Sequence, residues 1–211
     1  MLEDISPEAL KERLIDPQEY WGWPHGIAVE TQVIKQADVL QLLLLYPSLA
    51  DEQILSANWE YYAPRTQHGS SLSPSVYAIT GVRSGHVKEA YDFFITSCSI
   101  DLFHTNKSIS GGTFIGGIHT ASCAAAWQMA VYGFAGMDTL PQGYRFAPRL
   151  PESWCSLSFS LCRAGQRLAV SVTRDSCSIA ASRDNSKPVL VQAGAQQTAV
   201  FPGDQVCLKV R

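Results

Sequence analysis

Hydrophobic positions in the first part of the chain recur at helical spacing, and Ser, Asp and Pro stand where helices would begin. The clearest segment is 31–46, which is apolar on nearly all sides and ends before Pro47, so it predicts a buried helix. Further helices are predicted at 6–14, 51–62, 74–83, 86–98 and 118–132. The segments between them are long and carry glycine, which is typical of a helical toroid rather than a compact bundle.

The pattern changes to strand periodicity near the end of the chain. Residues 157–161 alternate hydrophobic side chains with serine, and Ala164-Gly165 separates this run from a second alternating run at 168–172. A hairpin is therefore predicted here. Further short strands are predicted at 177–181, 188–192, 197–201 and 205–210.

Together the two patterns predict a mainly α fold with a β module. We expect a helical domain over 1–140 and, after a boundary near Pro141, a small antiparallel β-sandwich over 141–211. Charge follows the same division. The first domain has 7 Lys and Arg against 15 Asp and Glu, a net charge of −8, and the second has 9 against 4, a net charge of +5.

Composition excludes several classes of protein. Of the 211 residues, 46% are hydrophobic and 17% charged, as in folded globular proteins, and the net charge of −3 gives no reason to expect nucleic acid. The six cysteines form no CxxC pair and match no zinc pattern, so no metal or other cofactor is expected. Residues 39–45 are too short to span a membrane, and the acidic start at 1–4 is unlike a signal peptide. We expect a reduced, cytoplasmic protein.

The segment 66–74 has the composition of an anion-binding corner at the start of a helix. Pro74 suits a first helical turn, and Ser70 and Ser71 can cap it. The free N–H groups of such a turn, together with the positive end of the helix dipole, attract phosphate or carboxylate. An ordinary serine-capped helix explains the same residues, so both interpretations stay open on the motif alone.

Other polar residues have a similar ambiguity. Lys35 and Gln36 interrupt an aliphatic helix, and they could either bind sugar hydroxyls in a polar cavity or form an internal ion pair with a neighbouring carboxylate. His119 follows a glycine-rich loop at a helix start, where imidazole can donate to an anion, cap the helix or pack. Glu60 and Asp101 are candidate acids or bases that could equally form surface pairs.

Several segments, in order, resemble the C-terminal part of glycoside hydrolase family 65, which comprises maltose, trehalose, kojibiose and nigerose phosphorylases and acid trehalases. The matching stretches are 32–39 (QVIKQADV), 61–66 (YYAPRT), 68–73 (HGSSLS), 117–119 (GIH), 133–136 (GFAG) and 148–154 (PRLPESW). Ala63 and Gly69 stand where family members often have an acidic residue. The resemblance covers about residues 30–175 and implies the last helices of an (α/α)6 barrel followed by a β-sandwich.

The resemblance also implies a reaction and residue roles. Phosphate, the co-substrate, attacks the anomeric carbon of an α-glucoside disaccharide with inversion, while a carboxylic acid protonates the departing oxygen, giving β-glucose 1-phosphate. Phosphate needs no general base once hydroxyls and imidazole position it. The residues that match the glucose subsite are Lys35 and Gln36. Those that match the phosphate pocket are Ser70, Ser71 and His119, with His68 nearby.

The general acid of the family lies upstream of the Lys-Gln motif, in a Gly-Pro-Asp-Glu-Tyr-like segment that this sequence lacks. We therefore expect no catalytic acid in this chain and interpret it as a fragment, split-gene product or truncated reading frame, inactive alone. An incomplete barrel predicts exposed apolar helix faces, and hence a homo-oligomer or association with a missing N-terminal part. The alternatives are a trehalase-like hydrolase, with Glu60 as the nearby carboxylate, and a non-catalytic sugar-binding remnant.

Overall fold

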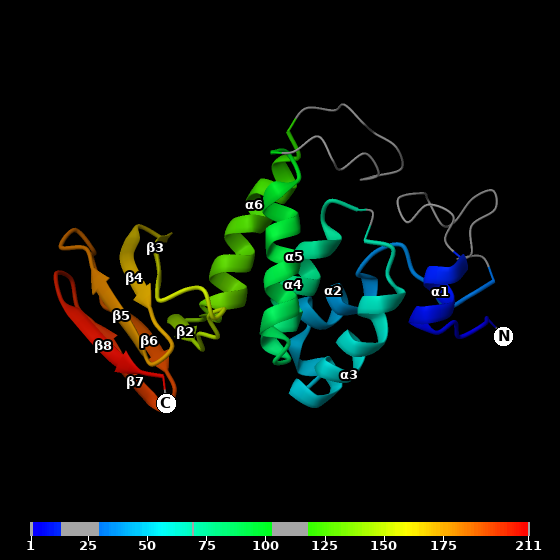
Figure 1. Cartoon of the computed structure of the whole chain (residues 1–211). Coiled ribbons are helices and arrows are strands. Elements are labelled where there is room, and N and C mark those ends of the chain that lie inside the picture. The colour runs from blue at the N-terminus through cyan, green and yellow to red at the C-terminus, as the bar shows by residue number, and fades with distance from the viewer. Residues whose placement is uncertain (1, 14–29, 69, 103–117, 211) are drawn as a thin grey trace. The chain divides into compact units, whose positions relative to one another are not determined.

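A computed structural model describes residues 2–13, 30–68, 70–102 and 118–210. The chain divides into two compact units, Met1–Met129 and Ala130–Arg211, the first helical and the second built from strands (Figure 1). The boundary predicted near Pro141 falls within the second of these units. Residues 137–140 form a strand that pairs within the second unit, and their hydrogen bonds place them there.

The described part of the helical unit consists of short helices packed around one helix that is buried along nearly its whole length. Its elements are α1 (Pro7–Arg13), α2 (Asp38–Leu45), η2 (Pro47–Leu49), α3 (Glu52–Tyr62), η3 (Ala63–Arg65), α4 (Ser73–Arg83), α5 (Val87–Ser99) and α6 (Thr120–Gln128). α4 is buried from Ser73 to Val82, and α5 lies beside it after a turn at Gly85, whose φ of +95° suits glycine. α6 contacts both α4 and α5. No helix in these described parts of the chain could cross a membrane.

The predicted helix at 31–46 is wrong in its first half. Residues 31–37 are not helical, and α2 begins only after them. The Ile34 N–H donates to the Arg65 carbonyl at 3.0 Å, and the Gln67 N–H donates to the Ile34 carbonyl at 3.0 Å. The segment is thus held in an isolated parallel bridge. A run that is apolar on nearly all sides does not distinguish such an irregular, partly buried segment from a buried helix.

An aromatic core supports this bridge. Trp59 on α3 and Tyr77 on α4 are buried and meet edge to face, with ring centroids 6.4 Å apart. The Trp59 indole N–H donates to the Tyr77 carbonyl at 2.9 Å, and the Tyr77 hydroxyl is hydrogen-bonded to the Thr66 hydroxyl. Burial raises the pKa of Tyr77 far above its usual value, so the phenol stays protonated. The core therefore fixes Thr66, where the loop leading to α4 begins.

The second unit contains two four-stranded sheets, ordered β1-β2-β6-β7 and β3-β4-β5-β8. A π-helical turn, η4 (Met129–Phe134), leads into it from α6. The strands are β1 (Met137–Leu140), β2 (Gly143–Phe146), β3 (Leu157–Arg163), β4 (Gln166–Val172), β5 (Ser176–Ala181), β6 (Val189–Ala193), β7 (Gln196–Val200) and β8 (Gln205–Lys209).

The alternating runs form strands as predicted, and Ala164-Gly165 forms the turn between β3 and β4. Two features differ from the expectation. Residues 141–142 connect β1 and β2 in an unpredicted hairpin instead of separating two domains, because two strands of four residues leave little visible alternation. The module is also not purely antiparallel, since β2 runs parallel to β6 with Gly143 opposite Leu190.

Candidate functional site

The predicted sugar-binding and phosphate-binding segments leave the helical core together. The parallel bridge between Ile34 and Thr66 aligns two segments that run in the same direction. One continues into Lys35 and Gln36, which are exposed and precede α2 rather than lying on a helix as predicted. The other continues into the loop 67–72. Parallel pairing therefore brings both motifs to the same end of the bridge.

Two serines of the loop are partly accessible to solvent. Ser70 Oγ accepts from the Leu72 N–H at 3.3 Å, which leaves its own O–H able to donate. Ser70 and Ser71 are both half-buried. α4 begins after Leu72 without a side-chain cap, so neither serine acts as the ordinary helix cap that the motif alone allowed. The hydroxyls are thus not explained by capping of α4.

The first turn of α6 contacts the same loop. The buried Ser122 hydroxyl donates to the Ser71 carbonyl at 2.9 Å. His119 is the N-cap residue of α6, three positions before Ser122, and residues at this spacing lie on the same side of a helix. This bond holds the serine loop against the end of α6 that begins with His119. The structure therefore brings Ser70, Ser71 and His119 into one region.

Asp101, just after α5, binds His119 at two points. Asp101 Oδ2 accepts from the His119 backbone N–H at 2.7 Å, and Oδ1 accepts from the His119 Nδ1–H at 2.7 Å. These hydrogen bonds, with that from the ring first, lower the pKa of Asp101 below its usual value. Since a carboxylate only accepts, Nδ1 carries a proton, and Nε2 is the nitrogen left for a ligand.

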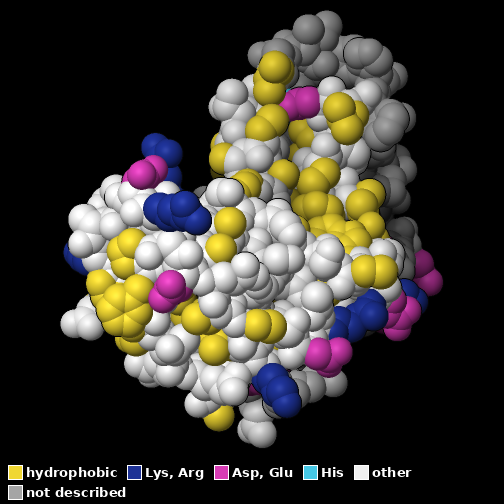
Figure 2. Space-filling view, turned by 90° about the vertical axis from the view of Figure 1, so that its left-hand side faces the viewer, with side chains coloured by type: hydrophobic (Ala, Val, Ile, Leu, Met, Phe, Trp, Pro, Cys, Tyr) yellow, Lys and Arg dark blue, Asp and Glu magenta, His cyan; other side chains and the backbone are white. Residues whose placement is uncertain are grey.

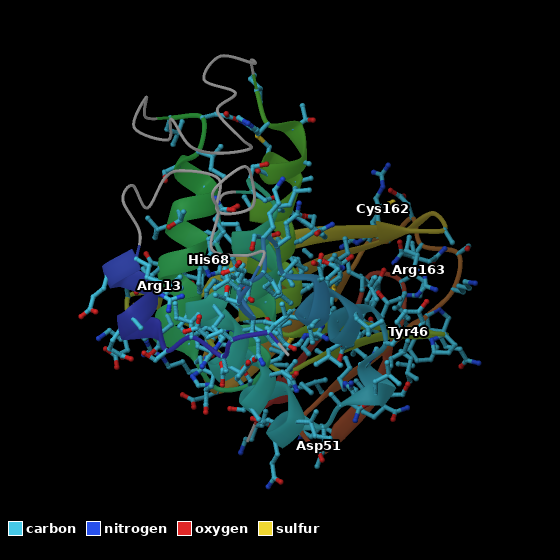
Figure 3. The ribbon with its side chains drawn as sticks, turned by 90° about the vertical axis from the view of Figure 1, so that its right-hand side faces the viewer. Arg13, Tyr46, Asp51, His68, Cys162 and Arg163 are labelled. Atoms are coloured by element: carbon cyan, nitrogen blue, oxygen red, sulfur yellow. The ribbon has the colours of Figure 1, made fainter. Side chains whose placement is uncertain are left out.

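His68 faces the core beneath the loop. Its Nε2 lies 2.8 Å from the Ala63 carbonyl oxygen, and its Nδ1 lies 3.4 Å from the Ser73 hydroxyl. The ring packs against Tyr77 and Phe93, with centroids 4.7 and 4.9 Å away, among the side chains of the helical unit (Figure 3). Burial lowers the pKa of His68, which favours the neutral ring. Both nitrogens have partners, so His68 is placed to hold the loop rather than to bind phosphate directly.

Glu60, the carboxylate that a hydrolase would need, lies in another setting. Its Oε1 accepts from the Ser56 hydroxyl at 3.1 Å and lies 3.3 Å from His86 Nε2. The His86 ring stacks on Trp59 at a centroid distance of 4.3 Å. Glu60 is therefore paired with residues of α3 and the start of α5.

Sequence reasoning missed a network that braces the bridge. Arg65 lies over the Tyr61 ring, 4.1 Å from its centroid, and donates to Asp4 Oδ1 at 3.1 Å. The Tyr61 hydroxyl is also hydrogen-bonded to Gln32. Three members of this network, Tyr61, Arg65 and Gln32, lie within the stretches that resemble family 65. That resemblance was the only feature of the sequence that pointed to them. Their link to Asp4, 57 positions before Tyr61, leaves no local pattern.

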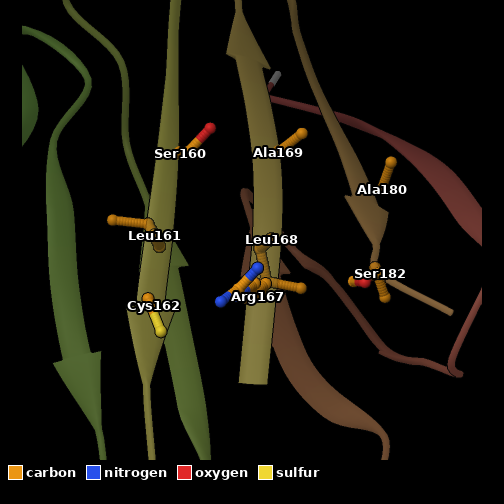
Figure 4. Close-up of a pocket in the computed structure, with 9 residues that line it drawn as sticks. Ser160, Leu161, Cys162, Arg167, Leu168, Ala169, Ala180 and Ser182 are labelled. Carbon is orange, nitrogen blue, oxygen red and sulfur yellow. The ribbon is translucent and has the colours of Figure 1, made fainter. Parts of the chain in front are cut away.

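The β unit offers a hollow with different chemistry. It lies on the face of β3, β4 and β5, where Ser160, Ala169 and Ala180 point to one side and Arg167 lies at one end (Figure 4). The residues that line it include no histidine or carboxylate, and their ionisable side chains are those of Cys162 and Arg167. Within the described ranges of the chain, no group of three or more His, Cys, Asp and Glu residues could hold a metal ion.

Comparison with known proteins gives the family. Residues 13–128 match the glycosyl hydrolase family 65 central catalytic domain, and residues 137–196 match the C-terminal domain of the same family. The chain belongs to glycoside hydrolase family 65. The resemblance carried by the short motifs is thereby confirmed.

Two similar proteins are named as phosphorylases. The 1,2-α-glucosylglycerol phosphorylase of Bacillus selenitireducens is 45% identical over 200 residues, covering 94% of this chain and 26% of that protein. The kojibiose phosphorylase of Caldanaerobacter subterraneus is 43% identical over 162 residues, covering 74% of this chain and 20% of that protein.

A solved structure supports the predicted fold class. A protein from the human microbiome, described as a kojibiose phosphorylase, matches 99% of this chain and 26% of its own, with 28% identity and a TM-score of 0.80. Family 65 membership and this likeness confirm the expected architecture of barrel helices followed by a β module. The chain spans about a quarter or less of the length of these relatives.

Proposed function

We propose that this chain forms the C-terminal part of an inverting α-glucoside phosphorylase, in which phosphate attacks the anomeric carbon and β-glucose 1-phosphate is released. The observation that carries the proposal is the hydrogen bond from Ser122 to the Ser71 carbonyl, which joins the serine loop to the end of α6 bearing His119. The phosphorylase activities named for the relatives support it.

The residues divide into two subsites in this proposal. Lys35 and Gln36 bind the glucosyl hydroxyls. The hydroxyls of Ser70 and Ser71 and the Nε2 of His119 bind inorganic phosphate, the co-substrate. Donors fixed in advance around an anion lower the barrier to its attack without a general base. The general acid that protonates the leaving oxygen comes from outside this chain, and no metal or organic cofactor takes part.

Phosphorolysis is favoured over hydrolysis because of where the carboxylates lie. An inverting hydrolase needs a second carboxylate that activates water at the anomeric carbon. Glu60 is bound to Ser56 and lies close to His86, and Asp101 is bound to His119. Neither is poised as a free base beside the serine loop.

The proposed enzyme is larger than the helical unit. Hydrophobic side chains gather on one face of that unit, in the upper right of Figure 2. Large hydrophobic side chains are also exposed at several positions of the described helices, whichever face they lie on. Those on or next to α2, η2, α3 and α6 include Leu42, Leu45, Tyr46, Leu49, Ile54 and Trp127. Further barrel helices, or a second copy of this chain, would cover such faces. The proposed setting is the cytoplasm, where cysteines stay reduced.

The proposal is tested by measuring the KM for phosphate and the KM for the disaccharide separately, in an enzyme that contains this chain as its C-terminal part. Ser70→Ala and His119→Ala are expected to raise the KM for phosphate by roughly tenfold or more, the loss of one hydrogen bond to a charged group. The KM for the disaccharide should change by less than about twofold. Ser178→Ala, on the β unit, is the control. An equal rise in both KM values, or full activity without phosphate, would contradict the proposal.

A further inference from the structure

Asp101 lies where a carboxylate does not stabilise its own helix. It follows the C-terminal end of α5, where the helix dipole is negative and a negative charge is slightly unfavourable. Its hydrogen bonds instead reach across to the beginning of α6, the positive end of that helix, and both go to His119. An aspartate at this position is therefore explained by its two hydrogen bonds to His119, and not by any stabilisation of α5.

The two bonds fix the imidazole in one orientation. One oxygen of the carboxylate holds the backbone N–H of His119 and the other holds Nδ1–H, each at 2.7 Å. Rotation about the Cα–Cβ or the Cβ–Cγ bond of His119 would move the ring and break the hydrogen bond between Nδ1–H and Oδ1. The two side chains are 30% and 24% exposed, so the pair is sheltered while a ligand can still reach the ring.

We infer that Asp101 is the positioning residue of His119, setting the ring so that Nε2 faces the phosphate bound by the serine loop. This inference rests on the proposed function, because it takes inorganic phosphate as the ligand of His119. When the ring is protonated on both nitrogens, Nε2–H donates a charge-assisted hydrogen bond to a phosphate oxygen, and the carboxylate behind the ring balances its charge. Asp101 itself does not touch phosphate.

Two measurements on the 211-residue chain test this role. The first is titration with inorganic phosphate, followed by calorimetry. Asp101→Asn is expected to weaken phosphate binding roughly tenfold to a hundredfold, as His119→Ala does, because the orienting charged hydrogen bond is lost. Asp101→Glu keeps the carboxylate and should recover part of the affinity. Asp92→Asn removes the same charge from an exposed position on α5 and should bind phosphate as the unmodified chain does.

The second measurement is the ¹⁵N NMR spectrum of the His119 ring. The unmodified chain should show a protonated Nδ1 in a strong hydrogen bond, with phosphate shifting mainly the Nε2 signal. In Asp101→Asn the Nδ1 signal should move toward that of a free imidazole. This spectrum decides the question even if Asp101→Asn proves unfolded by circular dichroism, because it is read on the unmodified chain.

The outcomes separate this inference from the function on which it rests. If phosphate binds and His119→Ala weakens it, but a folded Asp101→Asn binds equally well, the positioning role is overturned and the phosphate site stands. If phosphate shifts Nδ1 and leaves Nε2 unchanged, the assigned orientation is overturned. If the unmodified chain binds no phosphate at millimolar concentration, the phosphate site fails, and the role of Asp101 fails with it.

Discussion

His68 shows how single residues connect the core to the proposed site. Its φ of +55° lies in the left-handed region, which is unusual for a residue other than glycine and costs conformational energy. The contacts of its ring with Tyr77 and Phe93, and of its nitrogens with Ala63 and Ser73, hold it in this conformation. The turn at His68 then directs the chain toward the serines. We therefore expect His68 to act on phosphate binding through the shape of the loop.

The burial of His68 predicts a pH dependence of stability. Its pKa is lower in the folded chain than the 6.5 of a free side chain, so the unfolded state takes up the proton first as the pH falls. The stabilisation is complete above the unfolded pKa and is lost as the pH drops toward the folded one. Urea denaturation should therefore show a declining free energy of unfolding from pH 7 to about pH 5.5.

The matched variant is His68→Asn, since asparagine tolerates a positive φ. It should be less stable at pH 7, because the ring contacts are lost, but its stability should vary less over the same pH interval. A variant with an unchanged pH slope would show that other groups cause the decline.

At the level of elements, the sequence predicted what local patterns encode. Alternating hydrophobic and polar residues predicted strands at β3 and β4, and the Ala164-Gly165 turn between them predicted that they pair as a hairpin. Tertiary contacts decided the rest. The segment 31–37 is not helical, because Ile34 pairs with Thr66 and Thr31 with Glu3. The parallel contact between β2 and β6 joins strands far apart in sequence. The same limit applies to the site. A motif indicated His119, and Asp101 was only a candidate acid or base, so no local pattern predicted that the two residues pair across 18 positions.

The parallel contact between β2 and β6 gives a prediction at this scale. A Cβ added at Gly143 would lie 1.8 Å from the Leu190 carbonyl oxygen, which belongs to the backbone and cannot turn aside. Gly143→Ala should therefore separate the two strands and destabilise the β unit by roughly 2 kcal/mol or more. Urea denaturation would measure the loss, and faster amide hydrogen exchange in β6 would locate it.

Gly165→Ala is the control for this substitution. A Cβ added at Gly165 would have no atom close to it, so the only unfavourable effect of alanine there is its positive φ. We expect Gly165→Ala to lower the free energy of unfolding by about 1 kcal/mol. A Gly165→Ala variant that loses more stability than Gly143→Ala would show that backbone conformation outweighs strand contact in this sheet.

At the scale of the whole molecule, the helical unit combines a well-packed centre with apolar outer faces. α4 is buried along nearly its whole length, yet three leucines of α2 and η2, Leu42, Leu45 and Leu49, are 48%, 64% and 56% exposed. Exposed apolar groups of this kind are typical of contact surfaces. The chain spans about a quarter of the length of the 1,2-α-glucosylglycerol phosphorylase that it resembles.

Self-association of the isolated chain follows from these leucines. Sedimentation velocity at increasing concentration should show dimers or larger species, because association removes apolar surface from water. Leu42→Gln, Leu45→Gln and Leu49→Gln combined should shift the chain toward monomer while changing its stability little, since each side chain is already about half exposed. Phe201→Gln, which removes a side chain 56% exposed on the β unit, should leave self-association unchanged. If the unmodified chain is monomeric at all concentrations, these leucines are ordinary surface residues. The proposal that further helices cover α2 would then lose its physical basis.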